Sequence, residues 1–141
     1  MDILADRIKR HEGFRDRIYL DSEGFVTGGY GHHFYPGSRL PVDVAEVLFK
    51  QDLALAVSDY AKIASSIRRK LNTVRARVIV EMIFNMGLQK VLQFRKMWAA
   101  VEVDDWPEAK AQLLDSKWRQ QVGQRAVELA EIFEKGEDEN G

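Results

Sequence analysis

Residues 11–33 read HEGFRDRIYLDSEGFVTGGYGHH, and this stretch determines how the rest of the chain is interpreted. Glu12 stands where a short helix should end at Gly13, and Asp21 opens a turn between two strand-like runs. Thr27 lies on the returning strand. Two carboxylates and a hydroxyl on a helix end and a β-hairpin are the groups that acid-assisted cleavage of a glycosidic bond requires.

The residues before Glu12 predict a short amphipathic helix over 2–12, with Asp2 as N-cap and Leu4 and Ile8 on one stripe. The last turn of a helix carries partial negative charge, which favours the protonated form of Glu12 that a general acid needs. By itself, however, a glutamate before a C-cap glycine is more often a solvated surface residue.

Three glycines, Gly28, Gly29 and Gly31, follow Thr27 closely. Such density disfavours a regular strand interior and indicates close backbone approach or strong bending. A phosphate-binding loop is excluded because no Gly-Lys-Ser/Thr follows and no helix pattern begins there.

The remainder of the chain predicts helices. Pro41 begins an amphipathic connecting helix over about 41–62, and Asn72 caps a largely apolar helix that should be buried centrally. Its polar exceptions, spaced four residues apart on one stripe, are Arg77, Glu81 and Asn85. This stripe either faces solvent, with an ion pair between Arg77 and Glu81, or lines a cleft. The sequence alone favours the solvent-facing arrangement.

Further along, the pattern predicts one amphipathic helix over 91–101, another starting at Trp106, a polar break over 115–123 and a last helix over 126–133. The three tryptophans are interpreted as core residues rather than as a sugar-stacking platform. Residues 134–141 form an acidic tail that is expected to fray.

Composition limits the possible functions. The 141 residues suit one domain, and the absence of cysteine excludes disulfides and thiolate metal sites. A net charge of −1 predicts no strong attraction to nucleic acid, and the basic run at 68–70 lacks interleaved aromatics. We expect no stable membrane insertion, because no apolar run approaches about 20 residues, and no signal peptide.

The spacing of Glu12, Asp21 and Thr27, with Glu-Gly after the helix and Thr-x-Gly-x-Gly-His at 27–32, resembles the signature of the phage-type lysozymes, endolysins that cut bacterial peptidoglycan. The similarity continues over nearly the whole chain, through Phe49-x-Gln51-Asp52, through Phe84-Asn85-Met86-Gly87, and through Ser116-x-Trp118 followed by Arg125.

The resemblance implies a single α+β, lysozyme-like domain. A small hairpin lobe over about 13–40 would be joined by the connecting helix over 41–62 to a larger helical lobe over 63–133. That lobe would include the N-terminal helix over 1–12 and one central buried helix, and a sugar-binding cleft would lie between the lobes.

The same resemblance assigns roles to the site residues. Glu12 would protonate the glycosidic oxygen, Asp21 would activate water and stabilise positive charge, and Thr27 would hold that water. The implied outcome is inversion, which requires carboxyl groups roughly 6.5–9.5 Å apart. Arg125 would orient Glu12.

His32 would pair structurally with Asp52, whereas His11 and His33 are interpreted as solvated. The further candidates for contact with substrate are Gly31, His32, Glu81 and Asn85. At Glu81, longer members of the family have an asparagine, so a third carboxylate near substrate would favour protonated Glu12 or repel anionic wall groups.

The predicted function is hydrolysis of the β-1,4 bond between N-acetylmuramic acid and N-acetylglucosamine by a monomeric muramidase that needs no metal or organic cofactor. The family implies a phage or prophage endolysin that lyses its host. It would be made in the bacterial cytoplasm and would reach the wall, on the periplasmic side, through a separate membrane-permeabilising protein.

Three other functions are weighed against this one. A lytic transglycosylase needs the acid but no positioned water, so Asp21 and Thr27 argue against it. A peptidoglycan-binding module that has lost its activity is disfavoured by the intact trio. A DNA-binding protein that uses the basic run at 68–70 is disfavoured by charge and leaves the glycine-rich hairpin unexplained.

Overall fold

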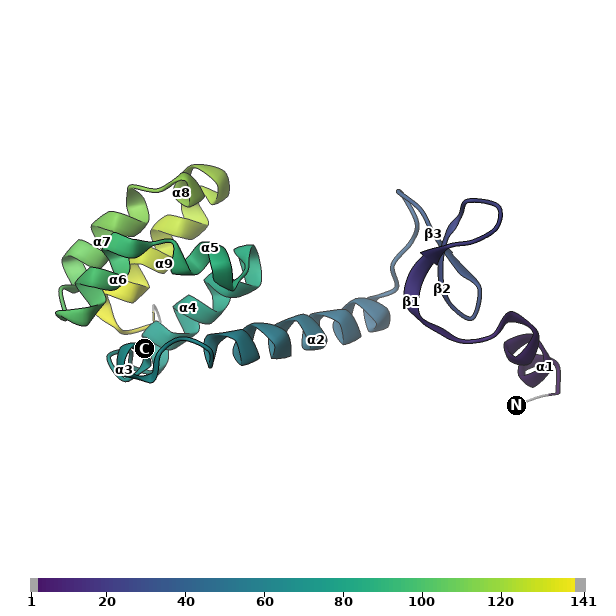
Figure 1. Cartoon of the computed structure of the whole chain (residues 1–141). Helices are drawn as coiled ribbons and strands as arrows, with labels where there is room; N and C mark the ends of the chain where they lie inside the picture. The colour runs from purple at the N-terminus through teal and green to yellow at the C-terminus, as the bar shows by residue number, and fades with distance from the viewer. Residues whose placement is uncertain (1–2, 139–141) are drawn as a thin grey trace. The chain divides into compact units, whose positions relative to one another are not determined.

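The computed structural model describes residues 3–138 and has the predicted α+β architecture, with a small antiparallel sheet and a larger set of helices (Figure 1). The chain divides into two compact units, Met1–Val44 and Ala45–Gly141. Helix α2, Val42–Tyr60, begins in the first unit and continues into the second.

The first unit contains one helix and three strands in the sheet order β1-β2-β3. These elements are α1, Ile3–Glu12; β1, Arg15–Leu20; β2, Val26–Gly29; and β3, His32–Phe34. The prediction of a two-stranded hairpin is therefore incomplete. Gly29 and Gly31 both adopt positive φ, which reverses the chain at residues 30–31 and adds the third strand.

Burial in the first unit is concentrated in β2, where Thr27 and Gly28 are the buried positions. Helix α1 buries none of its residues, and Ile3, Leu4 and Ile8 are exposed. The predicted N-cap, Asp2, lies outside the described residues.

The second unit is helical. After α2 come α3, Ser65–Arg68; α4, Thr73–Met86; α5, Leu88–Leu92; α6, Arg95–Glu102; α7, Trp106–Leu114; α8, Lys117–Val122; and α9, Gln124–Lys135. The predicted cap of α4 is confirmed, because the Asn72 side chain accepts a hydrogen bond from Arg75 N, and Gly87 ends the helix with φ +88°.

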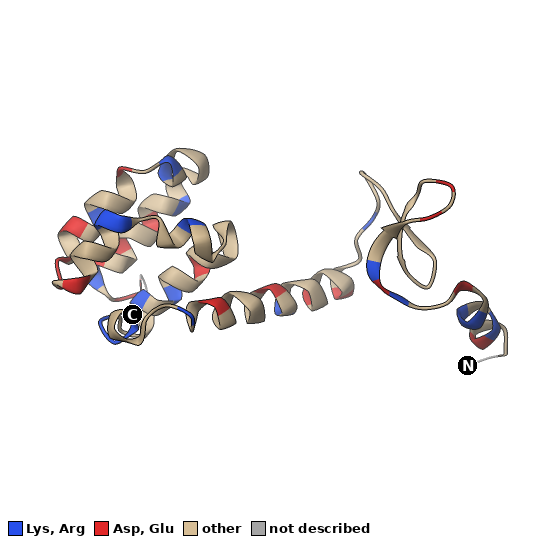
Figure 2. Cartoon of the chain, in the orientation of Figure 1, with Lys and Arg blue, Asp and Glu red and all other residues tan. Residues whose placement is uncertain are grey.

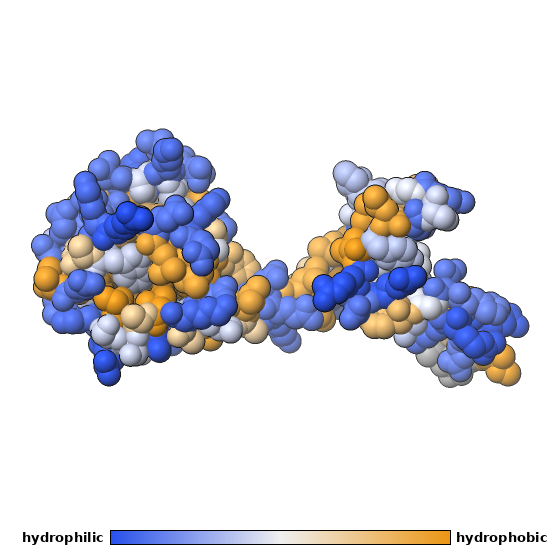
Figure 3. Space-filling view, in the orientation of Figure 1, coloured by the Kyte–Doolittle hydropathy of each residue, from blue (hydrophilic) through white to orange (hydrophobic). Residues whose placement is uncertain are grey.

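Helix α4 supplies much of the core of this unit, with Val78, Ile79, Met82 and Ile83 buried. It lies against α9, whose Phe133 is fully buried. A predominantly apolar helix of this kind gains its stability from packing on several sides, as the sequence predicted. Apolar side chains also remain visible on the surface, including along α2, which buries only Ala56 (Figure 3).

Two helix predictions in this unit are wrong. The single helix expected over 91–101 is split into α5 and α6, because Phe94 leaves the helical conformation and turns its ring edge-on to Trp118. The expected polar break over 115–123 contains α8. Ser116 caps that helix by accepting from Arg119 N, and Trp118 is buried.

The C-terminal end of α9 is held to the start of α4 by Arg75. The guanidinium lies 3.7 Å from the centroid of the Trp106 ring and donates to Phe133 O and Glu134 O, each at 2.7 Å. The acidic tail does not fray throughout, because Glu134 pairs with Lys110 at 3.4 Å. Residues 139–141 lie outside the described part.

We predict that Arg75→Lys lowers the free energy of unfolding by about 1–3 kcal/mol, because lysine cannot donate two bonds in a fixed fork while stacking on an aromatic ring. Denaturant unfolding would measure the change, with exposed Arg69→Lys as the matched control. Equal stability of the two variants would show that the contacts of Arg75 contribute nothing.

Candidate active site

Asp21 is fixed by the turn that it begins. Its Oδ1 atom accepts hydrogen bonds from the backbone N–H groups of Glu23, at 2.9 Å, and Phe25, at 2.8 Å. The turn closes when Asp21 N donates to Phe25 O at 2.9 Å. This local bonding explains the Asp-Ser-Glu-Gly sequence, since aspartate readily bonds to backbone two or more residues ahead of it. One carboxylate oxygen, Oδ2, is left for other partners.

The environment favours the ionised form of Asp21. The bond from Phe25 N–H is the largest cause that holds the pKa of Asp21 below its ordinary value of 3.8. Desolvation acts in the opposite direction, while Glu23 N–H, the nearby His33 and the Thr27 hydroxyl lower the pKa further. An ionised carboxylate at this position is able to accept a proton.

This lowered pKa predicts a pH dependence of stability in the first unit. Because the folded pKa lies below the unfolded value, the contribution is fully present above the unfolded pKa and is lost as the pH falls through the folded one. Hydrogen exchange of the hairpin amides as a function of pH would measure it. Asp21→Asn should flatten the acid end of that curve, and an unchanged curve would contradict the prediction.

Thr27 is the buried polar residue beside this carboxylate, with 2% of its surface exposed. Its hydroxyl donates to Phe25 O at 2.9 Å, and its Oγ1 atom lies 3.5 Å from Asp21 Oδ2. The shorter distance makes the bond to Phe25 O the stronger of the two, and the contact with Oδ2 is long. Thr27 Oγ1 and Asp21 Oδ2 thus form a pair of oxygens that lie side by side.

Glu12 ends α1 and contacts the glycine-rich turn. Gly13 closes the helix with φ +73°, and its N–H donates to Lys9 O at 2.9 Å. A Cβ built on Gly31 would lie 2.7 Å from Glu12 Oε2, so only glycine allows this approach. The glycine pattern therefore marks a close backbone approach, as the sequence predicted. Cationic residues share the last turn of α1, Lys9 and Arg10 among them (Figure 2).

Gly31→Ala is expected to displace the Glu12 carboxylate and lower kcat/KM by about tenfold or more, since small misplacements of a reacting group are costly. Positive φ adds a stability cost of about 1–2 kcal/mol. Gly37→Ala is the matched control, because Gly37 has φ +88° but no atom within 4 Å of a built Cβ. Similar activity of the two variants would mean that the Glu12 contact is unimportant.

His33 was interpreted from sequence as solvated, but the structure places it against Asp21. Its Nε2 atom lies 3.5 Å from Asp21 Oδ2, and its ring stacks on Phe25 with centroids 4.7 Å apart and planes 8° apart. The contact depends on the pairing of β3 with β2, in which His33 stands opposite Thr27. The sequence does not predict the third strand, so it carries no signal for this neighbour.

Three further site candidates, Glu81, Asn85 and Arg125, lie on the helical unit. Arg77, Glu81 and Asn85 are all exposed, as the solvent-facing interpretation predicts. The expected Arg77–Glu81 pair is wrong, because Glu81 Oε2 accepts from Arg125 Nε at 3.0 Å and Arg77 lies 3.7 Å from Asp138. The ion pair of Glu81 is therefore formed between α4 and α9, and not between successive turns of α4.

The other assignments join residues of different units and stay predictions. They are the contact of Arg125 with Glu12, the pairing of His32 with Asp52, and the cleft between the lobes. Within its own unit, His32 lies edge-on to the Phe34 ring, with centroids 4.7 Å apart.

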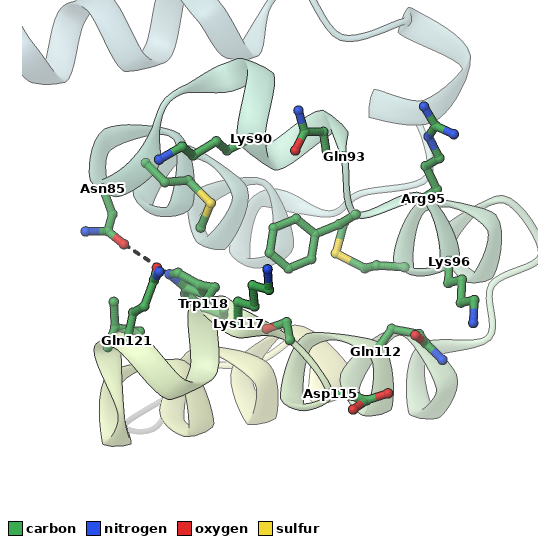
Figure 4. A pocket seen from close by; sticks show the side chains of 15 residues that line it. Asn85, Lys90, Gln93, Arg95, Lys96, Gln112, Asp115, Lys117, Trp118 and Gln121 are labelled. Atoms are coloured by element: carbon green, nitrogen blue, oxygen red, sulfur yellow. Dashed lines mark hydrogen bonds between the residues drawn. The ribbon is translucent and has the colours of Figure 1, made fainter.

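The helical unit also contains a pocket with a volume of about 720 Å³ (Figure 4). Asn85 stands at its edge and accepts a hydrogen bond from Trp118 Nε1 at 3.0 Å. Four cationic side chains and one acidic one contribute to the lining: Lys90, Arg95, Lys96, Lys117 and Asp115. Lys117 extends toward the centre of the view, whereas Arg95 and Lys96 point away from it (Figure 4). Lys117 is therefore the cationic side chain that is directed into the middle of the pocket.

Two kinds of feature are absent from residues 3–138. No helix in this range is both long enough and apolar enough to cross a bilayer. No group of three or more histidine or acidic side chains in the same range is arranged to hold a metal ion.

Comparisons with known proteins agree with the signature found in the sequence. The phage lysozyme family model matches residues 9–132. Two proteins of Dictyostelium discoideum, probable T4-type lysozymes 1 and 2, are each 26% identical over 94% of this chain and 94% of their own length. The pre-baseplate central spike protein Gp5 of Enterobacteria phage T4 is 28% identical over 94% of this chain, a match that covers 28% of the spike protein.

Proposed function

This chain belongs to the phage lysozyme family, and on that basis we propose that it hydrolyses the β-1,4 bond between N-acetylmuramic acid and N-acetylglucosamine in bacterial peptidoglycan. The observation that carries the proposal is the position of Thr27 Oγ1, 3.5 Å from Oδ2 of an Asp21 whose surroundings favour the ionised form. A hydroxyl and a carboxylate oxygen side by side suit a water molecule, which is able to donate a hydrogen bond to each.

In the proposed reaction, Glu12 gives its proton to the glycosidic oxygen while the bond from that oxygen to the anomeric carbon breaks. Water held by Asp21 and Thr27 attacks the same carbon from the opposite face, and Asp21 Oδ2 accepts the proton that this water loses. The configuration is inverted, and no covalent enzyme intermediate forms. Rapid NMR of the first product would test the inversion.

Arg125 is proposed as the residue that orients Glu12. In the structure its guanidinium is paired with Glu81, at 3.0 Å, so Glu81 competes with Glu12 for the same cation. This pairing also compensates the negative charge of Glu81, which reduces the repulsion between that side chain and an anionic polymer. Both residues are exposed, so the pair is able to exchange partners at little cost.

The pocket beside Asn85 is proposed to bind part of the wall polymer away from the reacting bond. Carboxylates of the peptide stems suit the lysine lining, and the sugar or peptide backbone would pack on Phe94. We further propose that the protein is a monomeric phage or prophage endolysin, which reaches the wall through a separate membrane-permeabilising protein and lyses the bacterial host.

The test is release of reducing ends from purified peptidoglycan, with the product masses measured. Products that carry one added water support hydrolysis, because the attacking water remains in the product. Anhydro products would instead establish a lytic transglycosylase. Folded protein that binds wall fragments but releases no reducing ends would be a binding module.

A further inference from the structure

The two carboxylate oxygens of Asp21 have different surroundings. Oδ1 is committed to the turn through its bonds with Glu23 N and Phe25 N. Oδ2 faces two side chains, those of Thr27 and His33, each with its nearest polar atom 3.5 Å away. The side that would accept a proton from water is therefore the side that His33 approaches.

The position of His33 is fixed independently of this contact. Strand β3 places it opposite Thr27, and its ring lies nearly parallel to the Phe25 ring, at 8°. Stacking favours this plane of the ring, in which Nε2 lies on the Oδ2 side of Asp21. The side chain is nevertheless 46% exposed, which leaves it accessible to solvent protons.

We propose that His33 is a positioning residue for Asp21: its Nε2 holds Oδ2 toward the attacking water and, when protonated, keeps that oxygen ionised in acid. The inference rests on the proposed function. It assigns a role in the reaction to His33, which the sequence predicts only to be solvated.

The two parts of this role act at different pH. Histidine side chains change charge between roughly pH 5 and pH 8. Near neutrality Asp21 is already ionised, because Phe25 N–H and its other partners lower its pKa, so only the orientation of Oδ2 depends on His33 there. In acid, protonated His33 faces Asp21 directly, with Glu23 on the same turn as the other nearby charge. Its charge then delays protonation of Asp21.

Two substitutions distinguish the contribution of the His33 ring, which stacks, from that of its Nε2 atom. His33→Phe keeps an aromatic ring to stack on Phe25 and removes Nε2, whereas His33→Gln restores a donor that does not titrate. His11→Gln removes a different exposed histidine and is the matched control. The measurements are kcat and KM on soluble peptidoglycan fragments from about pH 2 to about pH 8, thermal stability, and the carboxyl ¹³C titration of Asp21 over the same range.

For His33→Phe we expect kcat at neutral pH to fall roughly three- to tenfold with KM and thermal stability unchanged, because Oδ2 loses the side chain that orients it. The acid limb of activity and the ¹³C titration of Asp21 should both move to higher pH. His33→Gln should recover most of kcat at neutral pH but not the acid limb, and His11→Gln should match wild type throughout.

Wild-type kcat and an unshifted Asp21 titration in His33→Phe would overturn the inference, because stacking alone would then explain the contact. The ¹³C titration needs no catalysis, so it separates this failure from failure of the proposed function. If wild type releases no reducing ends but Asp21 titrates at higher pH in His33→Phe, the electrostatic contact stands and the proposed reaction falls.

Discussion

Glutamine in place of Glu12 is expected to lower kcat on peptidoglycan by about 10²–10⁴-fold while KM changes by less than about twofold. The amide keeps the size of the carboxyl group and its approach to Gly31, but it has no acidic proton to give to the leaving oxygen. An unprotonated sugar alkoxide is a poor leaving group, so bond cleavage itself should slow rather than binding. Release of reducing ends from soluble fragments would measure both constants.

Asp6→Asn is a suitable control for Glu12→Gln, because it removes one negative charge from an exposed position on the same helix. Its kinetics should match those of wild type. If Glu12→Gln also retains full activity, another acid must protonate the glycosidic oxygen, and the proposed assignment of Glu12 fails.

Asparagine in place of Asp21 should lower kcat by about 10²-fold or more, because it removes the group that accepts the proton from water. This substitution is well matched to the structure. The amide oxygen is still able to accept from Glu23 N and Phe25 N, so the turn should remain and circular dichroism at neutral pH should be unchanged. Reducing-end release and product mass would be measured as for Glu12→Gln.

The products made by Asp21→Asn would distinguish slow hydrolysis from cleavage without water. A hydrolase with a weakened base should make the same hydrated products slowly. A shift to anhydro products would mean that cleavage proceeds without the water, and wild-type rates would contradict a role for Asp21 in activating it.

Much of the fold could be predicted from sequence, because its signals are local. The Asn72 cap, the end of α4 at Gly87 and the start of α7 at Trp106 depend on residues a few positions apart. The break between α5 and α6 could not be predicted, since it follows from the packing of Phe94 on Trp118, 24 residues later. Likewise α8 has a polar surface and is stabilised by burying one tryptophan.

In the candidate site, too, features set by nearby residues could be predicted and contacts between distant residues could not. Asp21, its turn and the need for glycine near Glu12 follow from residue type and spacing within residues 11–33. The partner of Glu81 could not be predicted, because Arg125 reaches it from another helix, 44 positions away. The His33 contact depends on the register of β3 against β2. The sequence does not predict β3, because the glycines just before it disfavour a regular strand.

Thr27 Oγ1 donates to Phe25 O at 2.9 Å, so the backbone of the same hairpin holds this hydroxyl in place beside Asp21 Oδ2. A hydroxyl carries lone pairs as well as a proton, so Thr27 is able to accept from a molecule that lies between the two oxygens. A water molecule there has one hydrogen for each oxygen and keeps a lone pair for attack. On the proposed mechanism, one backbone-anchored hydroxyl therefore fixes the direction from which the nucleophile approaches.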